Sequence, residues 1–247
     1  MTLEQEISSW LKKYLLSNDL DSFVIGISGG IDSAVTSTLC AMTGCKTIVV
    51  TMPIHQNPIE TDRGIEHCSW LEKKYNNIEI LNIDLTDSYE QIKNSIPEKF
   101  NKPLALANTR ARIRMSILYL IAGSSKGIVV GTGNKIEDFG VGFFTKYGDG
   151  GVDISPIADL MKSEVYDLGY KLNIISSIMD AKPTDGLWDD GRTDEDQLGI
   201  SYDELEWAMN YNGEVINENQ QKILDIYNKH RNANLHKMKD IPIFKKK

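Results

Sequence analysis

Four short apolar runs, separated by segments of helical periodicity, constrain the fold of this chain more than any other feature. The runs lie at about 22–28, 46–54, 77–84 and 126–133. They are continuous rather than alternating in polarity, which is typical of strands buried on both faces. Parallel strands need a crossover between them, and here the crossovers have helical periodicity. The pattern therefore predicts an α/β fold with a doubly wound, mostly parallel, Rossmann-like sheet.

Apolar residues at helical spacing predict the helices of this fold. They are expected at about 3–14, 32–42, 59–75, 105–123, 163–172, 201–209 and 217–231. Beyond residue 150 the pattern becomes mostly helical, so a helical C-terminal part should follow the sheet. The polar and acidic segment 185–199 is expected to be a mobile loop.

Composition excludes several classes of protein. A chain of 247 residues with 41% apolar residues suits a single domain over 1–247. The formal charge of -8 argues against nucleic acid or an anionic membrane as a partner. No signal peptide and no run of 18 apolar residues is found, so a cytoplasmic protein is expected. The three cysteines lack the spacing of a zinc site or a disulfide scaffold.

The stretch GISGGIDS at 26–33 joins the first predicted strand to a helix. It matches the G-x-S-x-G nucleophile elbow of serine hydrolases, and His230 and His236 follow later in the chain. Such a hydrolase also needs an earlier strand for its second oxyanion amide, and only a helix precedes Phe23. The Walker A pattern fails because no Lys-Ser or Lys-Thr pair follows the glycines. The dinucleotide fingerprint lacks its third glycine and its acidic residue.

A pyrophosphate loop, S-G-G-x-D-S, fits the same stretch better. Gly29 and Gly30 let backbone N–H groups approach a phosphate, while Ser28 and Ser33 offer hydroxyl donors. The positive end of the following helix points at the same anion. Asp32 would repel phosphate unless Mg²⁺ lies between them, in which case it becomes a ligand. The alternative is a glycine-rich turn capped by Asp32 and Ser33.

An ordered set of further motifs points to one family. The chain carries, in this order, GISGGIDSAV, NTRARIRM, GTGNKIE, GFFTKYGDGGVD, PIADLMKSEV, KPTDGLW and NLHK. It resembles the ammonia-dependent NAD⁺ synthetases, which are pyrophosphate-loop ATPases with an adenine nucleotide alpha hydrolase-like fold. The resemblance implies ATP-dependent amidation of deamido-NAD⁺ through an adenylated carboxylate, with release of AMP and pyrophosphate. No glutaminase-like region precedes the loop, so free ammonia is the expected nitrogen donor.

The resemblance also implies which residues bind ATP and metal. The expected ATP-binding residues are Gly26, Ile27, Ser28, Gly29, Gly30, Ile31, Asp32, Ser33, Met52, Thr132, Lys162 and Thr184. Asp32 and Glu137 are the expected Mg²⁺ ligands, although Glu137 taken alone reads as a surface acid. Lys162 is also an expected catalytic residue, because its charge would offset the charge that develops on the leaving pyrophosphate.

The resemblance assigns a second set to the dinucleotide. The expected residues are Asn108, Arg112, Lys146, Asp153, His236 and Lys237. Asp153 could instead act as a catalytic residue that deprotonates ammonium. On the helix that carries Arg112, the side chains of Arg110 and Arg114 point the other way, and the alternative reading of that pair is a solvated basic face. The family is homodimeric, so a dimer with the dinucleotide near its interface is expected.

Two departures from the family pattern affect this assignment. The segment between Glu137 and Lys146 is one residue longer than in many bacterial relatives, so the direction of the Lys146 side chain is open. The acid that relatives often place two residues after the threonine is Gly186 here. Asp185 therefore receives no firm role.

Three other functions remain as alternatives. A nucleotide-binding regulatory module would keep the glycines but need neither Glu137 nor the His236-Lys237 pair. A GMP synthetase-like enzyme would share the loop but not the ordered motifs. A tRNA-modifying enzyme is disfavoured by the net acidity of the chain.

Overall fold

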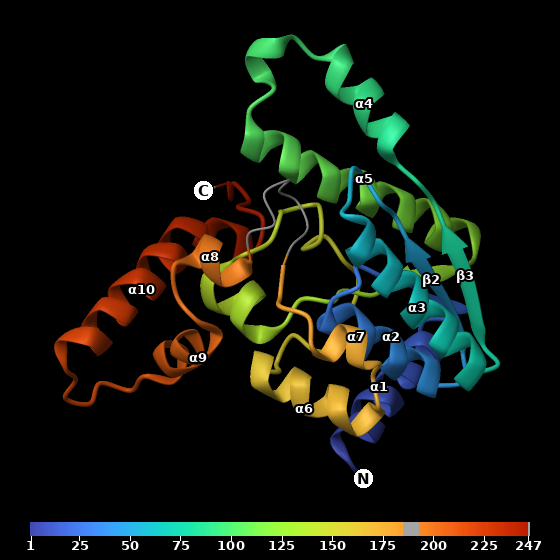
Figure 1. Cartoon of the computed structure of the whole chain (residues 1–247), viewed down its shortest axis with the longest axis horizontal. Coiled ribbons are helices and arrows are strands. Elements are labelled where there is room, and N and C mark those ends of the chain that lie inside the picture. Colours follow the sequence, from blue (N-terminus) through green and yellow to red (C-terminus); the bar gives the residue numbers. More distant parts are fainter. Residues whose placement is uncertain (185–192, 247) are drawn as a thin grey trace.

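The sheet has four parallel strands in the order β3-β2-β1-β4 (Figure 1). The computed structural model describes residues 1–184 and 193–246. The strands are β1 (Ser22–Gly26), β2 (Lys46–Thr51), β3 (Ile78–Asn82) and β4 (Gly127–Val129). The predicted parallel sheet is confirmed, but each strand is shorter than its apolar run. The residues left over at the end of each run form the carboxyl edge of the sheet.

Helices cover both faces of this sheet, as the buried strand pattern predicts. The covering helices are α1 (Leu3–Ser17), α2 (Ile31–Met42), α3 (Pro58–Lys74), α5 (Pro103–Ser124) and α6 (Lys162–Leu172). Phe23, Ile25 and Val49 pack on one face, in a cluster with residues of α1, α2, α3 and α6. Val24 and Ile48 point to the other face, where α5 covers them. Successive strand residues thus point to opposite faces, and both faces are buried.

The C-terminal helices form a third apolar cluster beside the sheet (Figure 1). The cluster joins a π-helix, η2 (Lys135–Val141), to α8 (Asp194–Leu198), α9 (Tyr202–Asn210) and α10 (Glu218–Met238). Two expectations need correction here. The part of 185–199 that the structure describes contains the helix α8 and is not simply a loop, and α10 continues past residue 231 to Met238. The longer helix places His236 and Lys237 in its last turn.

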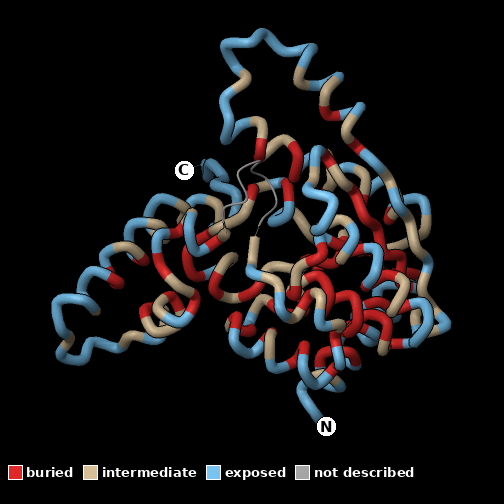
Figure 2. The backbone as a smooth tube through the Cα atoms, in the orientation of Figure 1, coloured by how far each residue is buried: buried red, intermediate tan, exposed pale blue. Residues whose placement is uncertain are grey.

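Short elements that the periodicity did not indicate complete the described chain. They are α4 (Thr86–Ser95), a 3-10 helix η1 (Glu98–Phe100) and α7 (Ser176–Met179). The arm from α4 to the start of α5 projects from the body and is largely exposed (Figures 1 and 2). Within 1–184 and 193–246, no helix combines the length and the apolar character that a membrane crossing requires.

The strand order creates a crevice at one edge of the sheet. β1 is central and pairs with β2 on one side and β4 on the other. The connections that leave β1 and β4 therefore diverge at the carboxyl edge, which is where open α/β sheets bind ligands. The segment 26–33 follows β1, and the segment 131–137 follows β4, so the two main sequence motifs meet at this point.

Candidate functional site

A cavity of about 700 Å³ lies at the carboxyl edge of β1 and β4. Its lining includes every residue that the sequence assigned to ATP or metal, from Gly26 to Thr184. It also includes most of the residues assigned to the dinucleotide, namely Asn108, Arg112, Lys146, His236 and Lys237. The structure thus gathers residues from segments far apart in the chain around one space.

The backbone of the glycine loop requires glycine at one position. Gly29 has a φ of +85°, and a Cβ built there would lie 2.4 Å from the carbonyl oxygen of Glu60. The Ser33 hydroxyl donates to the Gly30 carbonyl at 3.0 Å and accepts the Ser28 N–H at 3.3 Å. Helix α2 begins at Ile31 with Gly30 as its N-cap and no side-chain cap on that residue, while the Ser33 hydroxyl bonds to the turn itself. Its first N–H groups remain available for an anion.

The structure does not support a serine nucleophile at Ser28. The Ser28 hydroxyl contacts Ser33 Oγ at 3.1 Å and accepts the Gly30 N–H at 3.2 Å. Each of the four histidines makes a hydrogen bond elsewhere. The partners are Glu90 for His55, Ser37 for His67, the Leu198 carbonyl for His230 and the Ala233 carbonyl for His236. A catalytic triad needs a histidine on the serine, and none is placed there.

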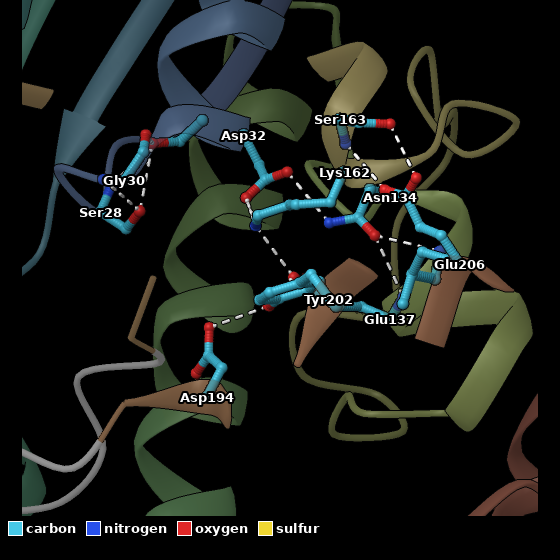
Figure 3. A network of polar contacts seen from close by, with 12 residues as sticks. Ser28, Gly30, Asp32, Asn134, Glu137, Lys162, Ser163, Asp194, Tyr202 and Glu206 are labelled. Carbon is cyan, nitrogen blue, oxygen red and sulfur yellow. Dashed lines mark hydrogen bonds and ion pairs between the residues drawn. The ribbon is translucent and has the colours of Figure 1, made fainter. Parts of the chain in front are cut away.

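Two carboxylates from the two sides of the crevice converge on one ammonium group (Figure 3). Lys162 Nζ lies 2.6 Å from Asp32 Oδ2 and 3.0 Å from Glu137 Oε1. Asn134 links the same two residues: its Nδ2 donates to Asp32 Oδ1 at 3.0 Å, and its Oδ1 accepts the backbone N–H of Glu137 at 3.1 Å. Asp32 on α2 and Glu137 on the π-helix η2 are therefore held together by a lysine from α6.

Burial and ion pairing shift the pKa values of these three groups in different directions. Burial raises the pKa of Asp32, more than the Lys162 ammonium lowers it. Burial also opposes the charge of Glu137, but the Lys162 ammonium and the Tyr202 hydroxyl outweigh it, so the pKa of Glu137 is lowered. The pKa of Lys162 is raised because both carboxylates overcome its burial. Lys162 is therefore a fixed positive charge inside the cavity.

The chemistry of this pair fits a divalent cation bound together with phosphate. Asp32 and Glu137 already converge on a positive atom, so their oxygens can share one cation. Among the described residues, no group of three His, Cys, Asp or Glu side chains forms a complete metal site. An ion held by this pair would need further oxygen ligands, and Mg²⁺ commonly takes them from phosphate and water.

The segment around Glu137 forms the π-helix η2. A π turn contains one more residue than an α turn, and such turns are frequent at functional sites. The Asn134 side chain caps its start, and Gly142, with a φ of +67°, ends it. The segment after it still brings Lys146 to the cavity.

Residues assigned to the dinucleotide make hydrogen bonds to one another and to neighbouring backbone within the cavity lining. Arg112 Nε donates to the Lys146 carbonyl at 3.2 Å, and Lys146 Nζ donates to the His236 carbonyl at 3.4 Å. Lys237 Nζ donates to the Phe144 carbonyl at 2.7 Å and lies over the Phe144 ring. α5, the loop after η2 and α10 together build this positively charged wall.

Asp153 is not brought to the cavity. Its carboxylate accepts the Tyr119 hydroxyl at 2.8 Å and the Val129 N–H at 2.9 Å. These bonds connect α5 to the end of β4, and Asp153 does not line the cavity. The structure therefore gives no support to a catalytic proton transfer by Asp153. Asp185, for which no role was assigned, lies outside the described residues.

Arg110 and Arg114 do not form a solvated basic face, and that alternative is wrong. Arg110 is buried. Arg114 Nε donates to the Met52 carbonyl at 2.9 Å, and its Nη2 donates to Gln56 Oε1 at 2.7 Å. Arg114 therefore braces the segment after β2 where Met52 lines the cavity.

Sequence reasoning missed further carboxyl groups that line the cavity. Burial, reinforced by the charge of Glu137, raises the pKa of Asp138 to about 8. Burial raises the pKa of Asp149 to about 6, although the Thr145 N–H donates to it. Asp194, the first residue of α8, also lines the cavity. Asp138 lies one residue after Glu137 and Asp149 within the motif GFFTKYGDGGVD, but no pattern in the sequence marked them as buried.

Comparison with known proteins identifies the family of this chain. The model of a protein family described as NAD synthase matches residues 3–247. The chain belongs to the NAD synthase family. A curated relative, the NH(3)-dependent NAD(+) synthetase of Finegoldia magna, is 34% identical to this NAD synthase family member over 95% of the chain and 92% of the relative.

Two solved structures resemble this NAD synthase family member along almost its whole length. The NMN synthetase from Francisella tularensis is 34% identical and covers 98% of the chain and 96% of its own, with a TM-score of 0.88. The NH3-dependent NAD synthetase from Campylobacter jejuni covers 98% of both chains at 24% identity, with a TM-score of 0.79. The second likeness supports the NAD synthase fold alone. The sequence family and the fold thus agree with each other.

Proposed function

We propose that this protein is a ligase that amidates deamido-NAD⁺ to NAD⁺ with ammonia and ATP. The substrate carboxylate attacks the α-phosphorus of ATP and releases pyrophosphate, and ammonia then displaces AMP from the acyl carbon. The observation that carries the proposal is the shared cavity. Part of its lining is the glycine loop with the Asp32–Lys162–Glu137 cluster. Another part carries positively charged side chains, which include Arg112 and Lys237.

The ATP side follows from the geometry of the loop. The N–H groups at the start of α2, near Gly30, would bind the phosphates, and Ser28 and Ser33 would add hydroxyl donors. Asp32 and Glu137 would hold Mg²⁺, which offsets phosphate charge when it is bound. Lys162 would then share its positive charge with the departing pyrophosphate.

The remaining assignments concern the edge of the ATP site. Met52, Thr132 and Thr184 line the cavity, and we assign Met52 to the adenine and the two threonines to the phosphates. Arg114 supports Met52 from α5. The family resemblance supports these assignments, together with the place of each residue in the lining.

The substrate side would place the carboxylate near the phosphates. Asn108, Arg112, Lys146, His236 and Lys237 all line the cavity. The positive charges of Arg112, Lys146 and Lys237 suit a ligand that carries phosphate, such as deamido-NAD⁺. Ammonium must lose a proton before it attacks, and we assign this step to no residue.

A second substrate deserves a direct test. The solved relative named as an NMN synthetase is 34% identical to the chain and has a TM-score of 0.88. A mononucleotide with the same nicotinate carboxylate could be adenylated and amidated by the same chemistry. The two substrates differ only in the adenylyl half, which leaves the reacting groups unchanged.

We further propose a cytoplasmic homodimer in which residues 1–247 form one domain, acting on small molecules and not on nucleic acid. The exposed apolar arm around α4 supports the dimer. Leu104, at the start of α5, is 63% exposed and also lines the cavity, so a second copy that covered the arm would reach the site.

The test is an amidation assay with ATP and Mg²⁺. Deamido-NAD⁺ and nicotinate mononucleotide are compared as substrates, and ammonium and glutamine as nitrogen donors. We expect one AMP and one pyrophosphate for each NAD⁺ formed, with ammonium preferred. Faster turnover of the mononucleotide would identify the second substrate, and preference for glutamine would overturn the nitrogen donor. Tight ATP binding without product would favour a regulatory module.

A further inference from the structure

Tyr202 contacts Glu137 from outside the cavity. Its hydroxyl donates to Glu137 Oε1 at 2.6 Å, and Lys162 Nζ donates to the same oxygen at 3.0 Å (Figure 3). Glu137 lines the cavity, whereas Tyr202 does not. Two donors on one oxygen restrict the rotation of the carboxylate, and one of them is out of reach of a ligand.

Tyr202 is itself held rigidly. It is the first residue of α9, and the Ser201 hydroxyl caps that helix by accepting the Glu204 N–H at 3.3 Å. The Tyr202 N–H donates to Glu195 Oε1 at 2.9 Å. The ring is buried in the third apolar cluster. The position of the hydroxyl is therefore set by helix capping and packing rather than by Glu137.

The hydroxyl has a single proton to donate and two acceptors in reach. Asp194 Oδ2 is 3.3 Å away, whereas Glu137 Oε1 is 2.6 Å away. The shorter contact has the length of a charge-assisted O–H···O bond, so Glu137 is the main acceptor.

The Lys162 ammonium group alone would not fix the orientation of the Glu137 carboxylate when a metal ion binds. It pairs with Asp32 as well, and a cation between the two carboxylates would compete with the ammonium group for their oxygens. Tyr202 is a neutral donor that approaches from the protein side. Its bond to Glu137 does not repel an incoming cation.

We propose that Tyr202 is a positioning residue, which holds the Glu137 carboxylate in the orientation that binds Mg²⁺ beside ATP. The inference rests on the proposed function for the identity of the metal and nucleotide. It extends the set of residues that build the site to α9, which contributes no lining residue of its own.

The experiment measures metal binding without turnover. Mn²⁺ is titrated, with detection of the free ion by electron paramagnetic resonance, in the presence of an ATP analogue with a methylene group between the α- and β-phosphates. We expect Tyr202→Phe to weaken Mn²⁺ binding about tenfold, as is typical when a partner of a metal ligand is lost. Tyr227→Phe is the matched control, because Tyr227 is a buried tyrosine of the same cluster, and it should bind Mn²⁺ like the wild type.

Tyr202→Phe could also weaken Mn²⁺ binding by destabilising the fold. The same substitution is therefore also measured in a protein that carries Glu137→Gln. In Glu137→Gln, adding Tyr202→Phe should change Mn²⁺ affinity no further, because the orienting bond has lost its target. Wild-type Mn²⁺ affinity in Tyr202→Phe, or an equal additional loss in the Glu137→Gln background, would overturn the inference.

Turnover separates this inference from the proposed function. Tyr202→Phe should raise the Mg²⁺ concentration needed for the half-maximal rate and leave the KM for ammonium unchanged. Weaker Mn²⁺ binding in a protein that forms no NAD⁺ would support the role of Tyr202 and contradict the proposed function. Normal amidation by Tyr202→Phe with an unchanged Mg²⁺ dependence would support the proposed function and contradict the role of Tyr202.

Discussion

At the scale of single residues, the central feature is the pairing of two buried carboxylates with one buried lysine. Asp32, Glu137 and Lys162 come from three segments and meet at distances of 2.6 and 3.0 Å. Sequence motifs predicted each of them as part of an ATP and Mg²⁺ site. Asn134 and Tyr202, which hold the carboxylates, were missed because an amide or a phenol carries no motif of its own. Their roles depend on contacts that only the fold creates.

The first residue-scale prediction concerns Asp32. Asp32→Asn removes one of the two charges that would hold Mg²⁺, so pyrophosphate release in Mg²⁺ should fall at least about a hundredfold. Pyrophosphate is measured with a coupled assay. The control is Asp159→Asn, because Asp159 forms only an exposed ion pair with Lys135 at 2.8 Å. Near-normal activity of Asp32→Asn would remove Asp32 from the metal site.

A second prediction compares two arginines on one helix. Arg112 contacts the segment that carries Lys146, whereas Arg114 braces Met52. Arg112→Ala should raise the KM for deamido-NAD⁺ about tenfold and leave the KM for ATP nearly unchanged, which corresponds to the loss of one charged contact. Arg114→Ala should raise the KM for ATP and leave the KM for deamido-NAD⁺ nearly unchanged. Steady-state kinetics with each substrate varied in turn would check both variants, and an ATP-only defect in Arg112→Ala would show that the assignment is wrong.

At the scale of elements, continuous apolar runs predicted the parallel sheet, because only strands buried on both faces have that pattern. Helix ends were less accurate. The predicted end of α10 at 231 missed two turns that pack on η2 through polar contacts, such as Asn234 Nδ2 to the Val141 carbonyl at 2.9 Å. The π-helix η2 was not predicted, because the apolar pattern does not distinguish a π turn from an α turn. Tertiary contacts decide both features.

The packing of α2 against α3 carries a pH-dependent prediction. His67 on α3 is fully buried and contacts Ser37 Oγ at 2.9 Å, and burial lowers the pKa of His67 to about 4. The unfolded chain therefore takes up a proton near pH 6.5 that the folded chain does not bind until about pH 4. The free energy of unfolding should decrease as the pH falls through this window, by about 2 kcal/mol at pH 5.

Urea unfolding of the wild type and His67→Phe from pH 7 to pH 4.5 measures this effect. As the pH falls, the free energy of unfolding should decrease more for the wild type than for His67→Phe. His55 is the comparison, because it is exposed and its ring contacts Glu90 at the surface, so His55→Phe should not reproduce the shift. A wild type and a His67→Phe variant with parallel pH profiles would contradict the prediction.

At the scale of the whole molecule, the sheet edge, the elements η2, α8 and α10, and the arm each contribute residues to one cavity. The arm carries several exposed large apolar side chains, namely Ile92, Ile96, Phe100 and Leu104. Large exposed apolar surfaces often mark contacts between proteins. This supports the expected homodimer and suggests why Leu104 both lines the cavity and lies at the surface.

Sedimentation velocity tests this arrangement. The wild type should sediment as a dimer, and Leu104→Asp should shift it toward the monomer because a charge would be buried at the contact. Leu120→Asp is the comparison, since Leu120 is 65% exposed but does not line the cavity. A monomeric wild type would exclude the dimer, and an unaffected dimer in Leu104→Asp would place the contact elsewhere.

The most direct test of the adenylated carboxylate uses deamido-NAD⁺ labelled with ¹⁸O in both carboxylate oxygens. One carboxylate oxygen forms the bond to the α-phosphorus, and it remains with the phosphate when ammonia displaces AMP. Mass spectrometry should therefore find one ¹⁸O in AMP and one in the amide of NAD⁺. Unlabelled AMP, or label in inorganic phosphate with ADP as the product, would contradict the account.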